Sequence, residues 1–334
     1  MNPHGTDDEE LIKTFEAYLR AFVERTSRAS PVHAQIAFHL GYDGERTVTR
    51  GKRLRPRLVA AAARACGGPI DATLAACTAV ELLHNYSLIH DDIEDGDRMR
   101  HGRTTVWAEF GMPHGVNAGD AVGALAQLAL APVAATLGAD VAMAMALDLA
   151  DANLRMCEGQ ALDLHFESGA SVGVDGYLEM ISGKTAALFA CAGSLGARAA
   201  RASAAEIERC ADVGRLFGIA FQIGDDADGI WGDAHHTGKS TQSDLSRRKK
   251  SYPIVWAMER DPSGAGRAVA EAYARPSAVV DDATVDALRD RLESAGARDA
   301  TIAAARDCLA RARARAAGIG PLEAFLDAWS KRSR

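Results

Sequence analysis

The stretch HDDIEDGDRMRHGR (residues 90–103) follows directly on the apolar run AVELLHNYSLI (79–89). Five carboxylates stand within seven positions, and four basic side chains come after them. The apolar run has the spacing of a buried helix, and on a helix Asp91 and Asp95 project from one face about a turn apart. Two ionised carboxylates that close repel each other, more strongly when they are partly buried. The stretch therefore predicts a helix whose acidic end requires a cation.

A second acidic cluster lies in FQIGDDADGIWGD (221–233), where another apolar helix runs into Asp225, Asp226 and Asp228. Two such ends facing each other would form an oxygen-only cage suited to Mg²⁺, which keeps several waters and commonly joins one or two carboxylates to substrate phosphates. The alternative is that each cluster is a solvated helix end. Because the pattern occurs twice, each time beside basic and amide residues, we favour a magnesium site.

Basic residues are concentrated in GKRLRP (51–56), RMRHGR (98–103), GKT (183–185), and TGK with SRRKK (237–250). Taken singly, each group is most often an exposed charged face. Together with two acidic clusters, they indicate a site for a polyanion such as a diphosphate, whose charge magnesium alone does not neutralise.

Apolar residues recur at three and four positions through nearly every segment, which predicts an all-α protein, and the abundance of alanine agrees. Breaks are expected at GGP (67–69), MPHG (112–115), GDAHHTGK (232–239) and DPSG (261–264). The expected helices span roughly 7–27, 31–42, 53–66, 71–95, 104–110, 117–137, 139–168, 173–182, 185–198, 203–230, 252–259, 264–274, 283–295, 298–316 and 321–331.

The composition excludes several classes of protein. A net charge of −7 argues against a nucleic-acid surface. The six cysteines lack CxxC or CxxH spacing, so neither a zinc site nor a disulfide framework is indicated. MNPHGTDDEE lacks the basic and apolar regions of a signal peptide, and the most apolar stretch, around 121–150, is repeatedly interrupted. We therefore expect a cytoplasmic protein without a transmembrane segment.

The ordered motifs GKRLRP, ELLHNYSLIHDDIED, NAGD (117–120), GQALDL (159–164), GKT, FQIGDDADG and TGKSTQSDLSRRKKSYP resemble those of trans-polyprenyl diphosphate synthases, over roughly residues 45–260. Within this family, the sequence most resembles the short-chain, geranylgeranyl diphosphate synthase-like members. It implies the class I isoprenoid synthase fold, a single helical bundle around a central cavity. Residues 31–334 would form this domain, after a partly flexible N-terminal segment and first helix at 1–30.

The resemblance also assigns roles to individual residues. It implies about three Mg²⁺ ions with substrate bound, joining carboxylates to phosphates. Their ligands would be Asp91, Asp95 and Asp225, with Asp92, Asp226 and Asp228 beside them. Isopentenyl diphosphate would be held by Lys52, Arg55, His84 and His101. The allylic diphosphate would be held by Arg100, Lys184, Thr185, Gln222, Lys239 and Lys249, for which Lys250 is an equal alternative, while Gln160 and Asp163 line the cavity.

Independent of the resemblance, His84 lies seven residues before Asp91 and so shares its helical face, which favours ligand contact. Two positions depart from the common family pattern. Gly229 stands where the second acidic motif usually ends in Asp, and His101 replaces an arginine, which Arg98 or Arg103 could compensate.

The implied reaction is condensation of isopentenyl diphosphate with an allylic diphosphate, with catalytic roles for Asp91, Asp95, Lys184 and Asp225. Tyr86 and Ser87, five and four positions before Asp91, would set chain length. A bulky Tyr86 with a small Ser87, and no insertion inside DDIED, resembles the C20 geranylgeranyl type rather than long-chain synthases, and the C15 farnesyl product is the alternative. Further alternatives are a class I terpene cyclase and a non-catalytic partner subunit on the same fold. A homodimer is the usual family assembly.

Overall fold

The structure is a computed structural model that describes residues 3–26, 30–44, 51–100, 102–167, 172–232, 243–274 and 280–332. The chain forms two compact units. Unit 1 comprises Met1–Asn153, Leu188–Gly214 and Ala316–Arg334, and unit 2 comprises Leu154–Ala187 and Arg215–Arg315. Each unit is described by itself.

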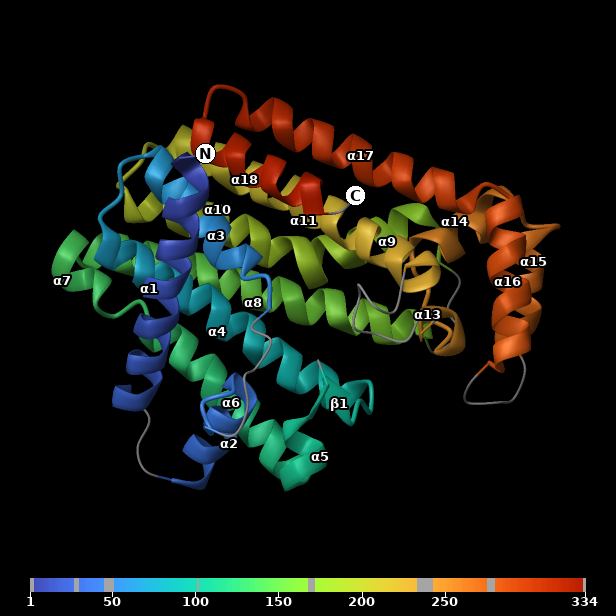
Figure 1. Cartoon of the computed structure of the whole chain (residues 1–334), viewed down its shortest axis with the longest axis horizontal. Coiled ribbons are helices and arrows are strands. Elements are labelled where there is room, and N and C mark those ends of the chain that lie inside the picture. The colour runs from blue at the N-terminus through green and yellow to red at the C-terminus, as the bar shows by residue number, and fades with distance from the viewer. Residues whose placement is uncertain are drawn as a thin grey trace. The chain divides into compact units, whose positions relative to one another are not determined.

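Unit 1 is built of helices and one short hairpin (Figure 1). Its elements are α1 (Pro3–Thr26), α2 (Pro31–Leu40), α3 (Leu54–Ala65), α4 (Ile70–Glu94), β1 (Met99–Arg100), β2 (Arg103–Thr104), α5 (Val106–Phe110), α6 (Met112–Leu128), α7 (Val133–Leu137), the first part of α8 (Ala139–Glu167), α10 (Ala187–Ala199), the first part of α11 (Ala204–Trp231) and α18 (Gly320–Arg332).

Unit 2 contains the remaining parts of α8 and α11 and a set of shorter helices. These are α9 (Val174–Ile181), the π-helix η1 (Ser182–Ala186), α13 (Ser243–Ser246), α14 (Tyr252–Arg260), α15 (Ala265–Tyr273), α16 (Asp282–Ser294) and α17 (Ala297–Ala316).

Helix α4 is the centre of unit 1, and α3 and α6 pack against it. Its residues 72–83 are buried without interruption, as expected of a helix that is apolar on all sides. Small residues let neighbouring helices approach closely. A side chain at Gly196 of α10 would overlap the carbonyl oxygen of Val59 in α3 and lie 2.8 Å from the Cβ of Ala62. The acidic end of α4 is thus carried by a rigid core helix.

The all-α prediction is confirmed, with differences at particular elements. The expected break at MPHG (112–115) was wrong, because α6 begins at Met112. Pro113 lies in the first turn, where its missing N–H has no intrahelical partner to lose. The expected helix over 117–137 ends instead at Leu128, and a turn at 129–132 separates it from α7. The hairpin of β1 and β2, with Met99 opposite Thr104, was not expected.

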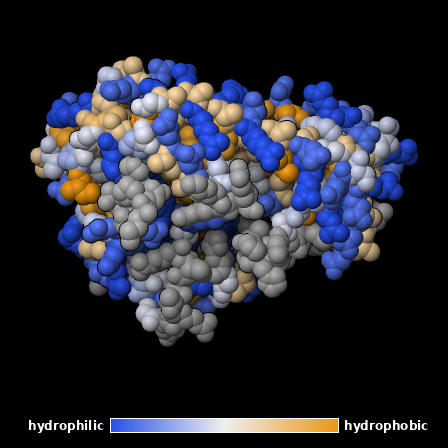
Figure 2. Space-filling view, turned by 45° about the horizontal axis from the view of Figure 1, so that its top comes forward, coloured by the Kyte–Doolittle hydropathy of each residue, from blue (hydrophilic) through white to orange (hydrophobic). Residues whose placement is uncertain are grey.

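Hydrophilic residues and scattered apolar ones share the face shown in Figure 2. Among the described residues, one stretch, Met112–Leu137, is long and apolar enough to cross a membrane by length and composition alone. It includes α6, which packs on α4, so a core helix accounts for it equally well. The apolar side chains that it leaves exposed are Met112, Val116 and Leu128.

Candidate functional site

The first acidic motif ends α4 in unit 1, where a basic residue folds back onto it. Arg100, on β1, donates from Nε to Asp92 Oδ1 at 2.6 Å and from Nη2 to Asp91 Oδ2 at 3.2 Å. Asp92 is 2% exposed, and burial raises its pKa to about 6 although Arg100 opposes the shift. Asp91 remains accessible, and Asp95 caps the helix. The hairpin therefore supplies the cation that the sequence required at this helix end.

Two further arginines of this segment have protein partners. The guanidinium of Arg98 lies over the ring of Trp107 at 5.3 Å. Arg103 donates to Asp43 at 2.9 Å. Both arginines are thus engaged within unit 1, which weakens the suggestion that either replaces an arginine at position 101. His101 itself lies outside the described residues.

The basic motif GKRLRP, expected to hold an anion, spans the start of α3 in unit 1. The Arg55 guanidinium stacks on the ring of Phe189 at 4.4 Å, and its Nε has no hydrogen-bond partner among the described residues. Burial lowers its pKa to about 10. The pKa of His84 lies well below its ordinary value because the imidazole is buried and Arg55 and Arg100 are near. Lys52 is exposed. A guanidinium with an unpartnered Nε can donate hydrogen bonds to an anion, which makes Arg55 a candidate anion receptor.

The two residues expected to set chain length lie on α4 between this receptor and the acidic motif. The Tyr86 ring meets the His90 ring edge to face, with centroids 4.8 Å apart. On its other side it contacts α6 at Gly123, where a Cβ would lie 3.2 Å from the Tyr86 ring. Ser87 donates to the His84 carbonyl at 2.8 Å. Tyr86 is therefore fixed between two helices.

In unit 2, the GQALDL and GKT motifs pack against each other. The GKT motif lies in the π-helix Ser182–Ala186, a geometry common at functional sites. Gly159 of α8 packs against it so closely that a Cβ there would overlap the Lys184 amide nitrogen. Lys184 Nζ donates to Asp163 Oδ2 at 2.6 Å. Because Gly159 and Gly183 have no side chains, α8 can approach the π-helix that carries Lys184 this closely.

The second acidic motif contains a buried hydrogen-bond hub. Asp226 Oδ2 accepts from the hydroxyl of Tyr177 and from the Tyr252 backbone N–H at 2.8 Å, and Oδ1 accepts from Gln222 Nε2 at 2.9 Å. Gln222 Oε1 in turn accepts from Thr185 Oγ1 at 2.7 Å. Burial and the nearby Asp244 raise the pKa of Asp226 to about 7. Asp226 therefore fixes two residues that were expected to hold diphosphate.

The accessible carboxylates of this motif are Asp225 and Asp228. Gly229 is explained by its surroundings, because a Cβ there would overlap the carboxylate of Asp244 and lie 2.9 Å from its Cγ. An aspartate at 229 would add like-charge repulsion to that overlap. The departure from the common motif follows from Asp244.

The remaining predicted residues are placed as follows. Gln160 is half-buried on α8 beside Gly159. The Lys249 backbone N–H donates to Asp244 at 2.9 Å, and partial burial lowers the pKa of Lys250. Lys239 lies outside the described residues.

Sequence reasoning missed several residues that the structure places beside the motifs. Tyr177 is fully buried, as its position on the apolar face of α9 could have indicated. No sequence signal separated Arg53 from Arg55 or singled out the acids that bind it, Glu16 and Glu81.

The donor set can be tested against magnesium. Among the residues in the described ranges, no three His, Cys, Asp or Glu side chains converge as a metal centre. Mg²⁺ does not require one, because it binds through one or two carboxylates, waters and substrate phosphates. Asp91 and Asp225 offer accessible carboxylate oxygen, which fits this ion.

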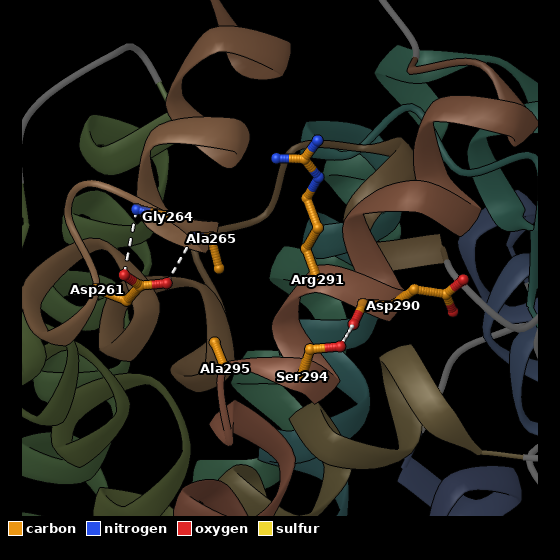
Figure 3. A pocket seen from close by; sticks show the side chains of 7 residues that line it. All are labelled: Asp261, Gly264, Ala265, Asp290, Arg291, Ser294 and Ala295. Atoms are coloured by element: carbon orange, nitrogen blue, oxygen red, sulfur yellow. Dashed lines mark hydrogen bonds between the residues drawn. The ribbon is translucent and has the colours of Figure 1, made fainter.

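A surface pocket of about 400 Å³ in unit 2 is unrelated to these motifs (Figure 3). It lies at Asp261 and Arg291, and the Asp261 carboxylate is satisfied by the backbone N–H groups of Gly264 and Ala265. None of the motif residues lines it.

Comparison with known proteins finds a family model, similar proteins and a similar solved structure. The polyprenyl synthetase family model matches residues 44–288. Two Mycobacterium tuberculosis proteins are similar: a geranylgeranyl diphosphate synthase, 40% identical over 257 residues (76% of this chain, 72% of that protein), and a (2E,6E)-farnesyl diphosphate synthase, 37% identical over 273 residues (79% and 74%). A solved polyprenyl synthase from Caulobacter crescentus CB15, complexed with calcium and isoprenyl diphosphate, is 29% identical with a TM-score of 0.82 and covers 98% of each chain.

Proposed function

Because the chain belongs to the polyprenyl synthetase family, and is therefore a prenyltransferase of the all-α class I isoprenoid synthase fold, we propose that it condenses isopentenyl diphosphate with an allylic diphosphate. The observation that carries the proposal is that the core helix α4 carries the first acidic motif and, seven residues before it, His84. The Arg55 guanidinium of α3 is near enough to His84 to help lower its pKa, and Asp91 shares the helical face of His84. The side chain next to the Arg55 receptor and the first acidic motif thus lie on one helix.

The chemistry follows from the charges on these residues. Arg100 and Lys184 stabilise a departing allylic diphosphate as its C–O bond breaks, in the way that fixed charges stabilise developing charge elsewhere. The isopentenyl double bond attacks the allylic cation to form the new C–C bond, and the released diphosphate accepts the proton lost from the product. Mg²⁺, held by Asp91, Asp95 and Asp225, would neutralise the diphosphate as a Lewis acid.

The proposed product is geranylgeranyl diphosphate. The relatives include both a geranylgeranyl and a farnesyl diphosphate synthase, so similarity alone does not choose between them. The choice rests on the resemblance of Tyr86 and Ser87 to the geranylgeranyl type, and Tyr86, whose ring meets that of His90 and faces Gly123, is proposed as the stop for the growing chain. Tyr86→Ala is expected to lengthen the products, and unchanged products would refute the assignment.

The assembly is proposed to be a cytoplasmic homodimer, with residues 31–334 acting as the synthase domain. Within unit 1, α6 exposes Met112, Val116 and Leu128, and the first part of α8 exposes Met143 and Leu147. A contiguous apolar patch, rather than single exposed side chains, is typical of an interface, and we propose that these residues form one. Sedimentation of the purified protein tests the dimer.

The deciding experiment is product analysis by mass spectrometry. The purified protein is incubated with Mg²⁺, labelled isopentenyl diphosphate, and dimethylallyl, geranyl or farnesyl diphosphate in turn. Labelled C20 product supports the proposal, and loss of turnover in Asp91→Ala ties it to the acidic motif. Conversion of an allylic diphosphate without label would indicate a cyclase, and no turnover alone would indicate a partner subunit.

A further inference from the structure

Two arginines at the start of α3, Arg53 directly before the helix and Arg55 in its first turn, have opposite electrostatic environments. Arg53 donates from Nε to Glu16 Oε1 at 2.6 Å and from Nη1 to Glu81 Oε1. Arg55, two residues later, stacks on Phe189 and has no ion pair among the described residues. Glu16 and Glu81 therefore both pair with Arg53, and the guanidinium of Arg55 is available for an external anion.

The backbone at Arg53 is strained in a way that this pairing explains. Arg53 adopts a left-handed conformation with φ 49° and ψ 39°, immediately before α3 begins at Leu54. A non-glycine residue in this region costs on the order of 1 kcal/mol or more and persists only where its surroundings enforce it. The two ion pairs supply that enforcement, and they fix where the chain turns into the helix that carries Arg55.

The cluster is buried and reaches the residue next to His84. Side chains of Arg53, Glu16 and Glu81 are 12%, 7% and 4% exposed. Asn85 donates to the Glu81 carbonyl at 2.7 Å, and Asn85 Oδ1 lies 3.0 Å from His39 Nε2 on α2. The cluster therefore joins α1, α2 and α4 to Arg53, the residue directly before α3.

Stability alone is a weak reason for such a cluster. Buried ion pairs lose hydration energy that their attraction barely offsets, and apolar residues of similar volume often serve equally well. What a rigid, doubly hydrogen-bonded guanidinium gives is a fixed geometry. Glu16 also lies on α1, outside residues 44–288 that match the family model, so the N-terminal helix contributes a side chain to the site.

We propose that Glu16 and Glu81 are positioning residues. They hold Arg53, and through it the start of α3, so that the Arg55 guanidinium stays oriented toward the diphosphate of isopentenyl diphosphate. The inference rests on the proposed function and adds to it the role of α1. It requires that replacing either glutamate weakens the binding of isopentenyl diphosphate and leaves the binding of the allylic diphosphate nearly unchanged.

The test uses Glu16→Gln and Glu81→Gln in the full-length protein, with Glu24→Gln as the matched control. Glu24 lies on the same helix α1 and pairs with Arg20 four residues away, with both side chains 53% exposed. We expect the KM for isopentenyl diphosphate to rise about tenfold or more in the two test variants, as loss of one charge-assisted hydrogen bond predicts. The KM for the allylic diphosphate should change less than about twofold, and Glu24→Gln should match the wild type.

Glu16→Asp and Arg53→Lys keep the charges while shortening or simplifying the contact, and they replace the glutamine variants if these do not fold. Partial recovery of the KM for isopentenyl diphosphate in Glu16→Asp supports positioning. An unchanged KM for isopentenyl diphosphate, or an equal rise in both KM values, overturns the inference. Two measurements separate the two proposals. A wild type that makes no product in the condensation assay refutes the proposed function. Equal calorimetric affinity of wild type and variants for isopentenyl diphosphate refutes the positioning role of Glu16 and Glu81.

Discussion

Replacing Gly159 by alanine tests whether the contact between α8 and the π-helix positions Lys184. A Cβ at this position would overlap the Lys184 amide nitrogen and lie 2.7 Å from the Met180 carbonyl oxygen, whereas ordinary contacts begin at 3.4 Å. Satisfying the second contact alone moves backbone by 3.4 minus 2.7, or 0.7 Å. The first contact requires more, and neither neighbour is a flexible side chain.

Both stability and activity should respond. Overpacking of this kind costs about 1–3 kcal/mol, which lowers Tm by about 1–4 °C in a protein of this size. A displacement of about 1 Å at a positioning group costs on the order of 100-fold in rate. We therefore expect kcat/KM for the allylic diphosphate to fall about 100-fold.

The assay is steady-state condensation with each substrate varied in turn, together with thermal unfolding. Gly320→Ala is the control, because nothing lies within 4 Å of a Cβ at that helical position. Gly159→Ala protein with the Tm and kcat/KM of the wild type would refute the reasoning.

Three further outcomes are expected. His39 is buried with a pKa of about 4, against about 6.5 unfolded, so the unfolded state binds the proton more tightly. Between pH 7 and 5 the free energy of unfolding of the wild type, measured by denaturant titration, should therefore fall by about 2 kcal/mol more than that of His39→Gln. Tyr177→Phe removes one donor to the buried Asp226 and should raise the KM for the allylic diphosphate about tenfold by steady-state kinetics, with less effect on that for isopentenyl diphosphate. Gly229→Asp should lower Tm by several degrees because of Asp244, and Gly229→Asp/Asp244→Ala should recover most of the loss in a melting experiment.

The parts of the fold that the sequence predicted are those encoded locally. The end of α4 was expected within a residue, because an apolar run passes directly into Asp91 and Asp92. The π-helix at GKT was not predicted, and its close contact with Gly159, more than twenty residues away, is a tertiary feature that leaves no local pattern. The pairing of Arg100 with the acidic motif depends likewise on a hairpin of two-residue strands, too short to leave a pattern.

The candidate site shows the same division. Residue types and spacing identified the acids and bases, but not which of two neighbouring charges is buried. Arg53 and Arg55 are two residues apart in one basic motif, and only the tertiary position of Glu16 and Glu81 distinguishes them. Roles that depend on a distant partner could not be derived from the motif alone.

The two aspartate pairs nevertheless contain a local signal that separates their members. Asp92 continues the buried register of Asn85 and Ile89, and Asp226 continues that of Ile219 and Ile223. In each pair the second aspartate is therefore buried and accepts hydrogen bonds from its own unit, and the first is the more exposed of the two, with Arg100 also contacting Asp91. A buried carboxylate held by protein donors is a poorer ligand for an external ion than a more exposed one, whereas its rigidity orients the helix end beside it. The apolar period running through each motif thus divides one chemical type into anchoring and ligand-binding positions.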